Sequence, residues 1–112
     1  MNGPELLREA GALVGFGWCQ GATARSVYGA PVDPCADEAV SWSLLGALQA
    51  ASFGREPASL NDIRAAVEAI GELLIDPSLS HWNDAPSRTK SEVRSLLSKA
   101  EQIARPAHAL NL

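Results

Sequence analysis

Four separate segments of the 112-residue chain carry apolar residues at intervals of three and four, the spacing that builds one apolar face on a helix. Capping residues or proline stand where these segments begin, and glycine or proline follows where they end. No segment alternates apolar and polar residues over a length that would favour a strand. The pattern therefore predicts an all-α protein, a compact bundle of about four helices in a single domain that spans residues 1–112.

Start and stop signals set the bounds of the predicted helices. Asp33 and Pro34 are interpreted as the opening of the second helix, because an aspartate cap is followed by proline at the first position. Gly15 and Gly17 are expected to end the first helix in the left-handed conformation that glycine tolerates. Pro106 is expected to stop the last helix. The expected helices cover residues 4–16, 34–51, 59–75 and 90–105.

Two of these helices carry informative faces. The C-terminal half of the second is rich in small residues, so we expect it to be the central helix, which its neighbours approach closely. The third is expected to turn one apolar stripe inward: Leu60, Ile63, Val67, Ile70 and Leu74.

Residues 22–36 form the longest irregular stretch of the chain. A turn signal at residues 28–31 divides it, and the short runs on either side allow at most a minor β-hairpin. Loops of about 15 residues are uncommon in compact domains and are sometimes functional.

Composition excludes several classes of function. The net charge is −4 with a pI near 5.0, which argues against nucleic-acid binding, and the basic residues between 88 and 99 are interpreted as solvated helix-surface charges. No apolar run approaches the roughly 18 residues of a membrane span, and no leader is evident, so we expect a cytoplasmic protein without membrane contact. Cys19 and Cys35 lack metal-ligand spacing, and no metal or cofactor is predicted.

The densest chemistry lies in residues 82–92. Trp82, Asn83, Asp84 and Arg88 suggest a recognition corner with a stacking ring, hydrogen-bonding groups and a guanidinium fork. A structural interpretation is favoured: the ring anchors the loop, an Asx turn precedes a proline, and Arg88 pairs with Asp84. Residues 89–92 are explained as a capping box that starts the last helix.

Three tryptophans stand out in a chain with few aromatic residues. We predict that Trp18, Trp42 and Trp82 approach one another and mark a single locus, although core packing alone would also explain them. A buried indole N–H needs a hydrogen-bond partner, and Gln20, Asn83 and Asp84 are the nearest candidates in sequence. The candidate residues for binding a ligand or partner are Trp18, Gln20, Trp82, Asn83, Asp84 and Arg88.

Catalytic chemistry has weaker support. His81 can serve as a base or metal ligand, but it lacks a second ligand at a matched spacing, so we interpret it as a solvent-facing loop histidine. Cys19 as a nucleophile needs His81 as its base and Gln20 beside an oxyanion, and nothing in the sequence brings them together. An inert, partly buried thiol is the favoured interpretation, and no catalytic residue is predicted.

The chain resembles DUF6197, a family of small actinobacterial and phage proteins of unknown function. The resemblance covers nearly the whole sequence, and it implies a compact fold but no activity, cofactor or catalytic residue. Ser43 departs from the cysteine expected in many members. The matching motifs are Trp18-x-Gln20-Gly21-Ala22-x-Ala24, Ala39-Val40-x-Trp42-x-Leu44-x-Gly46-Ala47-Leu48, and Trp82-Asn83-Asp84-x-Pro86-x-Arg88-Thr89-x-x-Glu92-Val93-x-x-Leu96-Leu97-x-x-Ala100.

The sequence favours a non-enzymatic binding or interaction module whose partner is an unidentified protein or small molecule. The alternative is a small hydrolase or transferase with a site between the turn at residues 18–20 and the loop at residues 82–88. A homodimer through the small-residue face of the second helix is a third option. A polar pocket with a perturbed titratable group would favour the enzyme, and an apolar patch around Phe53 and Leu60 would favour a partner surface.

Overall fold

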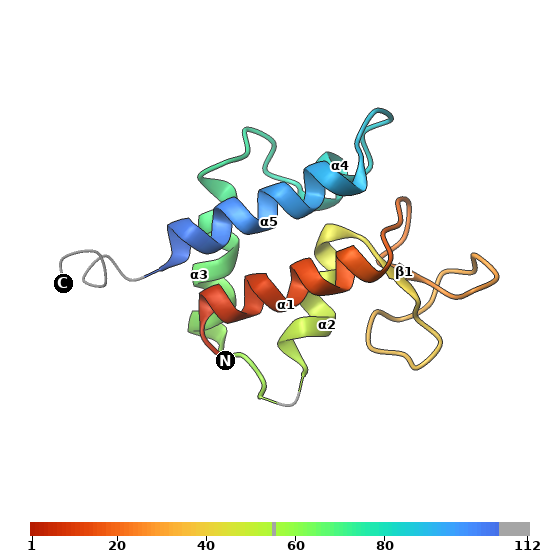
Figure 1. Cartoon of the computed structure of the whole chain (residues 1–112), viewed down its shortest axis with the longest axis horizontal. Coiled ribbons are helices and arrows are strands. Elements are labelled where there is room, and N and C mark those ends of the chain that lie inside the picture. The colour runs from red at the N-terminus through yellow and green to blue at the C-terminus, as the bar shows by residue number, and fades with distance from the viewer. Residues whose placement is uncertain (55, 106–112) are drawn as a thin grey trace.

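The computed structural model, which describes residues 1–54 and 56–105, confirms a predominantly helical fold with one short antiparallel strand pair (Figure 1). Helices α1 and α5 lie side by side and run in opposite directions, while α2 and α3 pack behind them. The elements are α1 (Gly3–Phe16), β1 (Ala24–Arg25), β2 (Ser41–Trp42), α2 (Leu44–Ser52), α3 (Leu60–Gly71), α4 (Leu79–Asn83) and α5 (Lys90–Ala104).

A single apolar core lies between the two helix layers. Its largest fully buried apolar side chains come from α1, α2, α3 and α5, so burial of these side chains holds the four longer helices together. None of the helices in the described residues has the length and apolar character to cross a bilayer. The largest fully buried apolar side chains of the core are Leu6, Leu7, Val14, Leu44, Ile70, Val93 and Leu97.

Helix α1 begins as predicted but ends differently. Asn2 caps it, and the Glu5 side chain returns to the Asn2 backbone in a full capping box. Gly17 follows the helix with φ −165°, which is extended backbone rather than the predicted left-handed conformation. Glycine is needed for another reason, because a Cβ there would lie 2.2 Å from the Val40 carbonyl oxygen.

The second helix is shorter than predicted. Asp33 accepts a hydrogen bond from the Cys35 N–H in a turn, and α2 begins only at Leu44, where the Ser43 hydroxyl caps it. The prediction was wrong because Ser41 and Trp42 pair with residues 24–25 as a strand. An Asp-Pro pair suits a turn as well as a helix start, so it could not exclude this outcome.

The small-residue face of α2 is covered within the chain. Gly46, Ala47 and Ala51 are buried, and a Cβ on Gly46 would lie 1.8 Å from the Thr23 carbonyl oxygen. This face packs against α1 and against Thr23, which lies just before β1. The prediction that the second helix is the central one is wrong, because α1 is the helix that contacts α2, α3 and α5. The buried Gly46, Ala47 and Ala51 are not exposed to a second copy.

Helix α3 ends at Gly71, four residues before the predicted end, and its predicted inward stripe is confirmed in part. Ile70 is fully buried, and Ile63 and Leu74 pack partly buried against the core. Leu60 is 80% exposed and Val67 is 42% exposed, although both were expected inward. The small residues Ala66 and Ala69 are buried as well, and they permit a close approach of α3 to its neighbours α1 and α5.

The start of α5 confirms a prediction, whereas α4 was not predicted. Helix α5 carries the predicted Thr89–Glu92 capping box, and Pro106 with the tail lies outside the described residues. Helix α4, capped by Ser78, was not predicted. The long loop contains the minor strand β1 and a tight turn in which the Ser26 N–H donates to the Ala30 carbonyl.

Candidate functional site

Asn83 lies at the centre of the predicted site and is fully buried. Its Oδ1 accepts from the Trp18 indole N–H at 2.8 Å and from the Leu44 backbone N–H at 3.0 Å. Its Nδ2 donates to the Cys19 carbonyl at 3.1 Å and to Asp84 Oδ1 at 2.9 Å. The amide has two acceptor sites and two donors, so its hydrogen-bonding capacity is filled by the protein itself.

Gln20 and Gly21 extend this network. Gln20 Nε2 donates to the carbonyls of Asn83 and Ala85, both at 2.9 Å, and the Gly21 N–H donates to Asp84 Oδ1 at 3.0 Å. Trp18, Gln20, Asn83 and Asp84 are called the Asn83 clasp below. The clasp joins the segment after α1 to α4 and the turn that follows it.

The clasp brings together four of the six predicted binding residues, but not as two walls of a cleft. Direct hydrogen bonds close the space that was expected between residues 18–20 and residues 82–88. Several direct hydrogen bonds between the same two segments indicate a structural connection between them. A ligand would have to break them in order to use Asn83.

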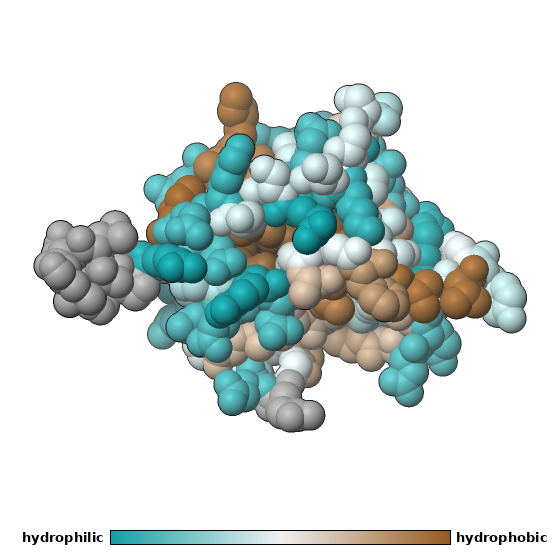
Figure 2. Space-filling view, viewed as in Figure 1, coloured by the Kyte–Doolittle hydropathy of each residue, from teal (hydrophilic) through white to brown (hydrophobic). Residues whose placement is uncertain are grey.

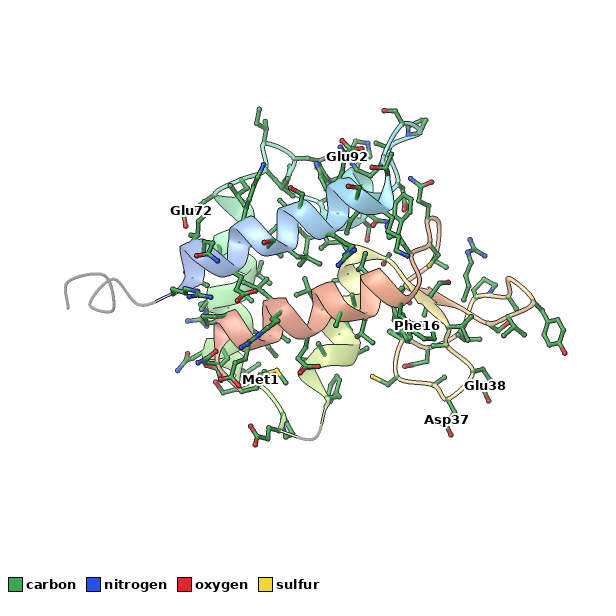
Figure 3. The ribbon with its side chains drawn as sticks, viewed as in Figure 1. Met1, Phe16, Asp37, Glu38, Glu72 and Glu92 are labelled. Atoms are coloured by element: carbon green, nitrogen blue, oxygen red, sulfur yellow. The ribbon has the colours of Figure 1, made fainter. Side chains whose placement is uncertain are left out.

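Arg88 and Trp82 form a second unit beside the clasp. The guanidinium carbon lies 3.8 Å from the centroid of the Trp82 ring, a cation–π arrangement. Arg88 Nε donates to the Trp82 carbonyl at 2.9 Å, and Nη1 pairs with Glu92 Oε2 at 3.2 Å. The predicted pairing of Arg88 with Asp84 is wrong, because the Arg88 guanidinium pairs with Glu92 instead. Figure 3 shows Glu92 at the start of α5.

The three tryptophans occupy neighbouring segments but do not form one ring cluster. Trp18 and Trp42 lie in a backbone bridge, and Trp18 meets Asn83 as predicted. The Trp42 indole instead donates to the Pro34 carbonyl at 2.9 Å, and its ring meets Phe16 edge-on at 6.2 Å. Within the described chain no indole stacks on another, so the prediction holds for the segments and fails for the rings.

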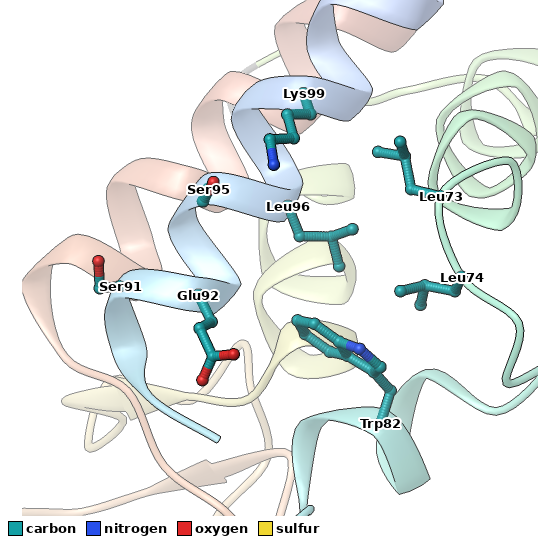
Figure 4. Close-up of a pocket in the computed structure, with 8 residues that line it drawn as sticks. All are labelled: Leu73, Leu74, Trp82, Ser91, Glu92, Ser95, Leu96 and Lys99. Atoms are coloured by element: carbon teal, nitrogen blue, oxygen red, sulfur yellow. The ribbon is translucent and has the colours of Figure 1, made fainter. Parts of the chain in front are cut away.

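A groove opens beside Trp82, with a volume of about 450 Å³. Figure 4 shows Leu73 and Leu74 facing Leu96 across it, while the Trp82 ring lies below with its nitrogen edge on the side of Leu74. Ser91, Glu92, Ser95 and Lys99 also line it, all from α5. We call this cavity the Trp82 groove.

The Trp82 groove contains an indole N–H that donates to no residue of the described ranges, 1–54 and 56–105. Trp18 and Trp42, by contrast, donate to Asn83 and Pro34. Lys99 likewise makes no ion pair within the described ranges. A donor and a positive charge thus remain available beside three leucines.

Sequence reasoning missed the groove residues other than Trp82. Leu73 and Leu74 were assigned to an extension of the third helix, but they follow its end and fold toward Trp82. Ile75 next to them is fully exposed, and Figure 2 shows an apolar projection over the connection between α3 and α4. The available signal was three consecutive apolar residues before Asp76-Pro77, which a helical stripe does not require.

A wider cavity of about 620 Å³ lies on the Arg88 side of Trp82 and is lined by His81 and Asp76. These two side chains form an exposed ion pair. The hydrogen bond that His81 Nδ1 donates to the Asp76 carboxylate raises the pKa of His81 and lowers the pKa of Asp76. Among the described residues no three potential ligands gather to hold a metal ion.

Cys19 has the surroundings of an inert thiol. It is 8% exposed, and its Sγ donates to the Ala22 carbonyl at 3.6 Å. Burial raises its pKa, which keeps the thiol protonated and weakly nucleophilic at neutral pH. Cys35 is exposed, and the two cysteines are not joined in a disulfide.

Comparison with known proteins places this arrangement in a family. No curated protein and no solved structure matches the chain. One family model does match, over residues 2–103, and it thus covers the clasp, the Trp82 groove and all five helices except the last residue of α5. The chain belongs to the family of unknown function DUF6197.

Proposed function

We propose that the protein is a non-enzymatic binding module that receives an apolar group, carrying a hydrogen-bond acceptor, in the Trp82 groove. The observation that carries this proposal is the free Trp82 indole N–H at the edge of an apolar cavity. Binding sites combine apolar walls with a few convergent polar groups, and this groove has both. Lys99 on its rim favours an acceptor that carries negative charge, such as a carboxylate.

The Asn83 clasp supports this role by fixing the groove in place. Asn83 follows Trp82 directly and is held by four hydrogen bonds, so the backbone beneath the ring has little freedom. The Arg88 guanidinium covers one face of the Trp82 ring, and its Nε donates a hydrogen bond to the Trp82 backbone carbonyl. A rigid ring loses less entropy when it receives a ligand, which improves affinity without adding contacts.

The alternative, a small hydrolase or transferase, has less support. His81 paired with Asp76 beside a cavity resembles a base with its orienting group, but the pair is exposed and needs a nucleophile. Cys19 is buried in the clasp region and hydrogen-bonded to a backbone carbonyl. A cytoplasmic location and a role as an accessory factor of a mobile element or its host belong to the same proposal, and they rest on the sequence and its resemblance.

A titration followed by ¹⁵N–¹H NMR tests the binding role, with phenylacetate and N-acetyl-leucine amide as probes. The chain gives three indole N–H signals, and a Trp82→Phe variant identifies the one from Trp82. We expect that signal to move at about millimolar probe, the affinity typical of fragments this small. The Trp18 and Trp42 signals should stay in place, because both indoles already donate within the protein.

A matched pair of variants locates the effect. Leu73→Asp places a carboxylate in the groove and should weaken binding at least fivefold, whereas Val27→Asp makes the same change on the exposed long loop and should have no effect. If neither probe moves the Trp82 signal, or if Leu73→Asp binds as the unmodified chain does, the proposed function is wrong.

A further inference from the structure

An apolar surface lies between α2 and α3, away from the Trp82 groove. Phe53 at the end of α2 is 75% exposed, Leu60 is 80% exposed and Val67 is 42% exposed. Phe53 and Val67 line an apolar cavity of about 250 Å³, together with Leu6 and Ile63. Contiguous exposed apolar residues on this scale mark interaction surfaces, and this is the patch that the sequence singled out as favouring a partner.

One edge of α3 is built like a helix-pairing seam. Leu60, Arg64, Val67 and Gly71 follow one another at intervals of four, three and four, which places them in a single row along the helix. Leu60 stands at one end of the row. Gly71 stands at the other, and a Cβ added there would meet no atom within 4 Å.

We propose that a second copy of this chain packs on this row, with the two α3 helices antiparallel about a two-fold axis between residues 65 and 66. In that arrangement Leu60 of each copy lies over Gly71 of the other, so a large side chain meets an open position. Val67 lies over the aliphatic stem of Arg64. The apolar cavity at the side of the row then receives apolar side chains from the second copy.

Charge complementarity identifies the occupant as a second copy. With Val67 of one copy over the Arg64 stem of the other, the adjacent Glu68 comes within reach of that Arg64 guanidinium, and the two-fold axis gives two identical ion pairs. Both side chains are exposed, and no ion pair within the described ranges involves either of them. An arginine four residues before a glutamate is the weaker order for pairing within one helix, so both charges stay available to a partner.

The expected dimer is weak. Twelve residues give α3 a length of about 18 Å, and with the end of α2 this offers an area at the low end of specific interfaces. We therefore expect a monomer–dimer equilibrium that is visible between about 5 and 500 µM protein.

Sedimentation velocity over that concentration range tests the proposal. The unmodified chain should shift from monomer toward dimer as concentration rises, and Val67→Glu should weaken dimerisation at least tenfold. Val27→Glu, a matched change on an exposed loop residue, should leave it unaltered. Far-UV circular dichroism confirms that each variant is folded.

A charge exchange makes the test specific to this geometry. Arg64→Glu and Glu68→Arg should each weaken the dimer at least threefold, and the double variant should regain the affinity of the unmodified chain. The proposal is overturned if the unmodified chain stays monomeric at 500 µM, if Val67→Glu dimerises normally, or if the double variant is no better than the single ones. Because the probes report on the Trp82 groove and sedimentation on α3, failure of one proposal does not decide the other.

Discussion

A fully buried asparagine between two layers of structure requires a specific reason. Asn83 offers two acceptor positions and two donors, and the protein uses all of them: an indole N–H, a backbone N–H, a backbone carbonyl and a carboxylate oxygen. Aspartate would lose the donors, and alanine would remove all four hydrogen bonds. The residue is therefore determined by its neighbours and needs no ligand to explain it.

Asn83→Ala is expected to lower the free energy of unfolding by about 3–5 kcal/mol, because each buried group left unpaired costs about 1–3 kcal/mol. Urea unfolding followed by circular dichroism measures the change. Asn61→Ala is the matched control, since Asn61 is exposed on α3 and should change stability by less than about 0.5 kcal/mol. A loss below about 1 kcal/mol for Asn83→Ala would show that water replaces the lost partners.

At the scale of elements, two helical glycines have opposite roles. Gly46 in α2 lies against the Thr23 backbone, where a Cβ would come within 1.8 Å of the carbonyl oxygen. Gly11 in α1 has room, because a Cβ there would lie 3.9 Å from the nearest atom, Leu97 Cβ. Only the first glycine is therefore required by packing.

The same substitution at the two positions should have opposite effects on thermal stability. Gly11→Ala should stabilise by about 0.5–1 kcal/mol, because alanine loses less backbone entropy in a helix. Gly46→Ala should destabilise by more than about 2 kcal/mol, because backbone must move to admit the methyl group. Melting curves of the two variants test this, and equal shifts in one direction would contradict the close approach of α2 to Thr23.

The elements also show how far the sequence could predict the structure. The predictions of helices α1 and α5 were correct because local signals define these helices, and a capping box lies at the start of each. The predicted start of α2 was wrong, and the predicted stripe of α3 was only partly right, because distant contacts decide both. Strand β1 pairs with Trp42, and packing against α1 and α5 buries Ile70 but leaves Leu60 and Val67 exposed.

The candidate site follows the same division. The residues of the clasp were identified, since Trp18, Gln20, Asn83 and Asp84 do meet. The structural role of these residues was not predicted, because a sequence cannot show whether a hydrogen-bonding group finds its partner within the protein. The Trp82 groove was missed for a related reason: it forms where Leu73 and Leu74 leave the helix, and that point depends on where α3 ends.

At the scale of the whole molecule, the Asn83 clasp joins three segments that are far apart in the sequence. Trp18 follows α1, Leu44 begins α2 and Asn83 ends α4. The Asn83 side chain accepts hydrogen bonds from both Trp18 and Leu44. Residues 65 positions apart in sequence are thereby held within hydrogen-bond distance. Helices α1 and α5 pack along each other, and the C-terminal end of α1 and the N-terminal end of α5 lie on the side of the clasp (Figure 1).

Because the clasp and the helices share their core contacts, we expect the described domain to unfold as one cooperative unit. Tryptophan fluorescence reports on the clasp, through Trp18, and on the neighbouring Trp82. Circular dichroism at 222 nm reports on the helices. The two melting curves should give the same midpoint within about 1 °C, and Asn83→Ala should lower both midpoints together by about 10 °C or more, given the expected loss in a domain of this size. If fluorescence changes well before ellipticity, the clasp opens while the helices persist, and the Trp82 groove would then lie on a separately mobile edge of the fold.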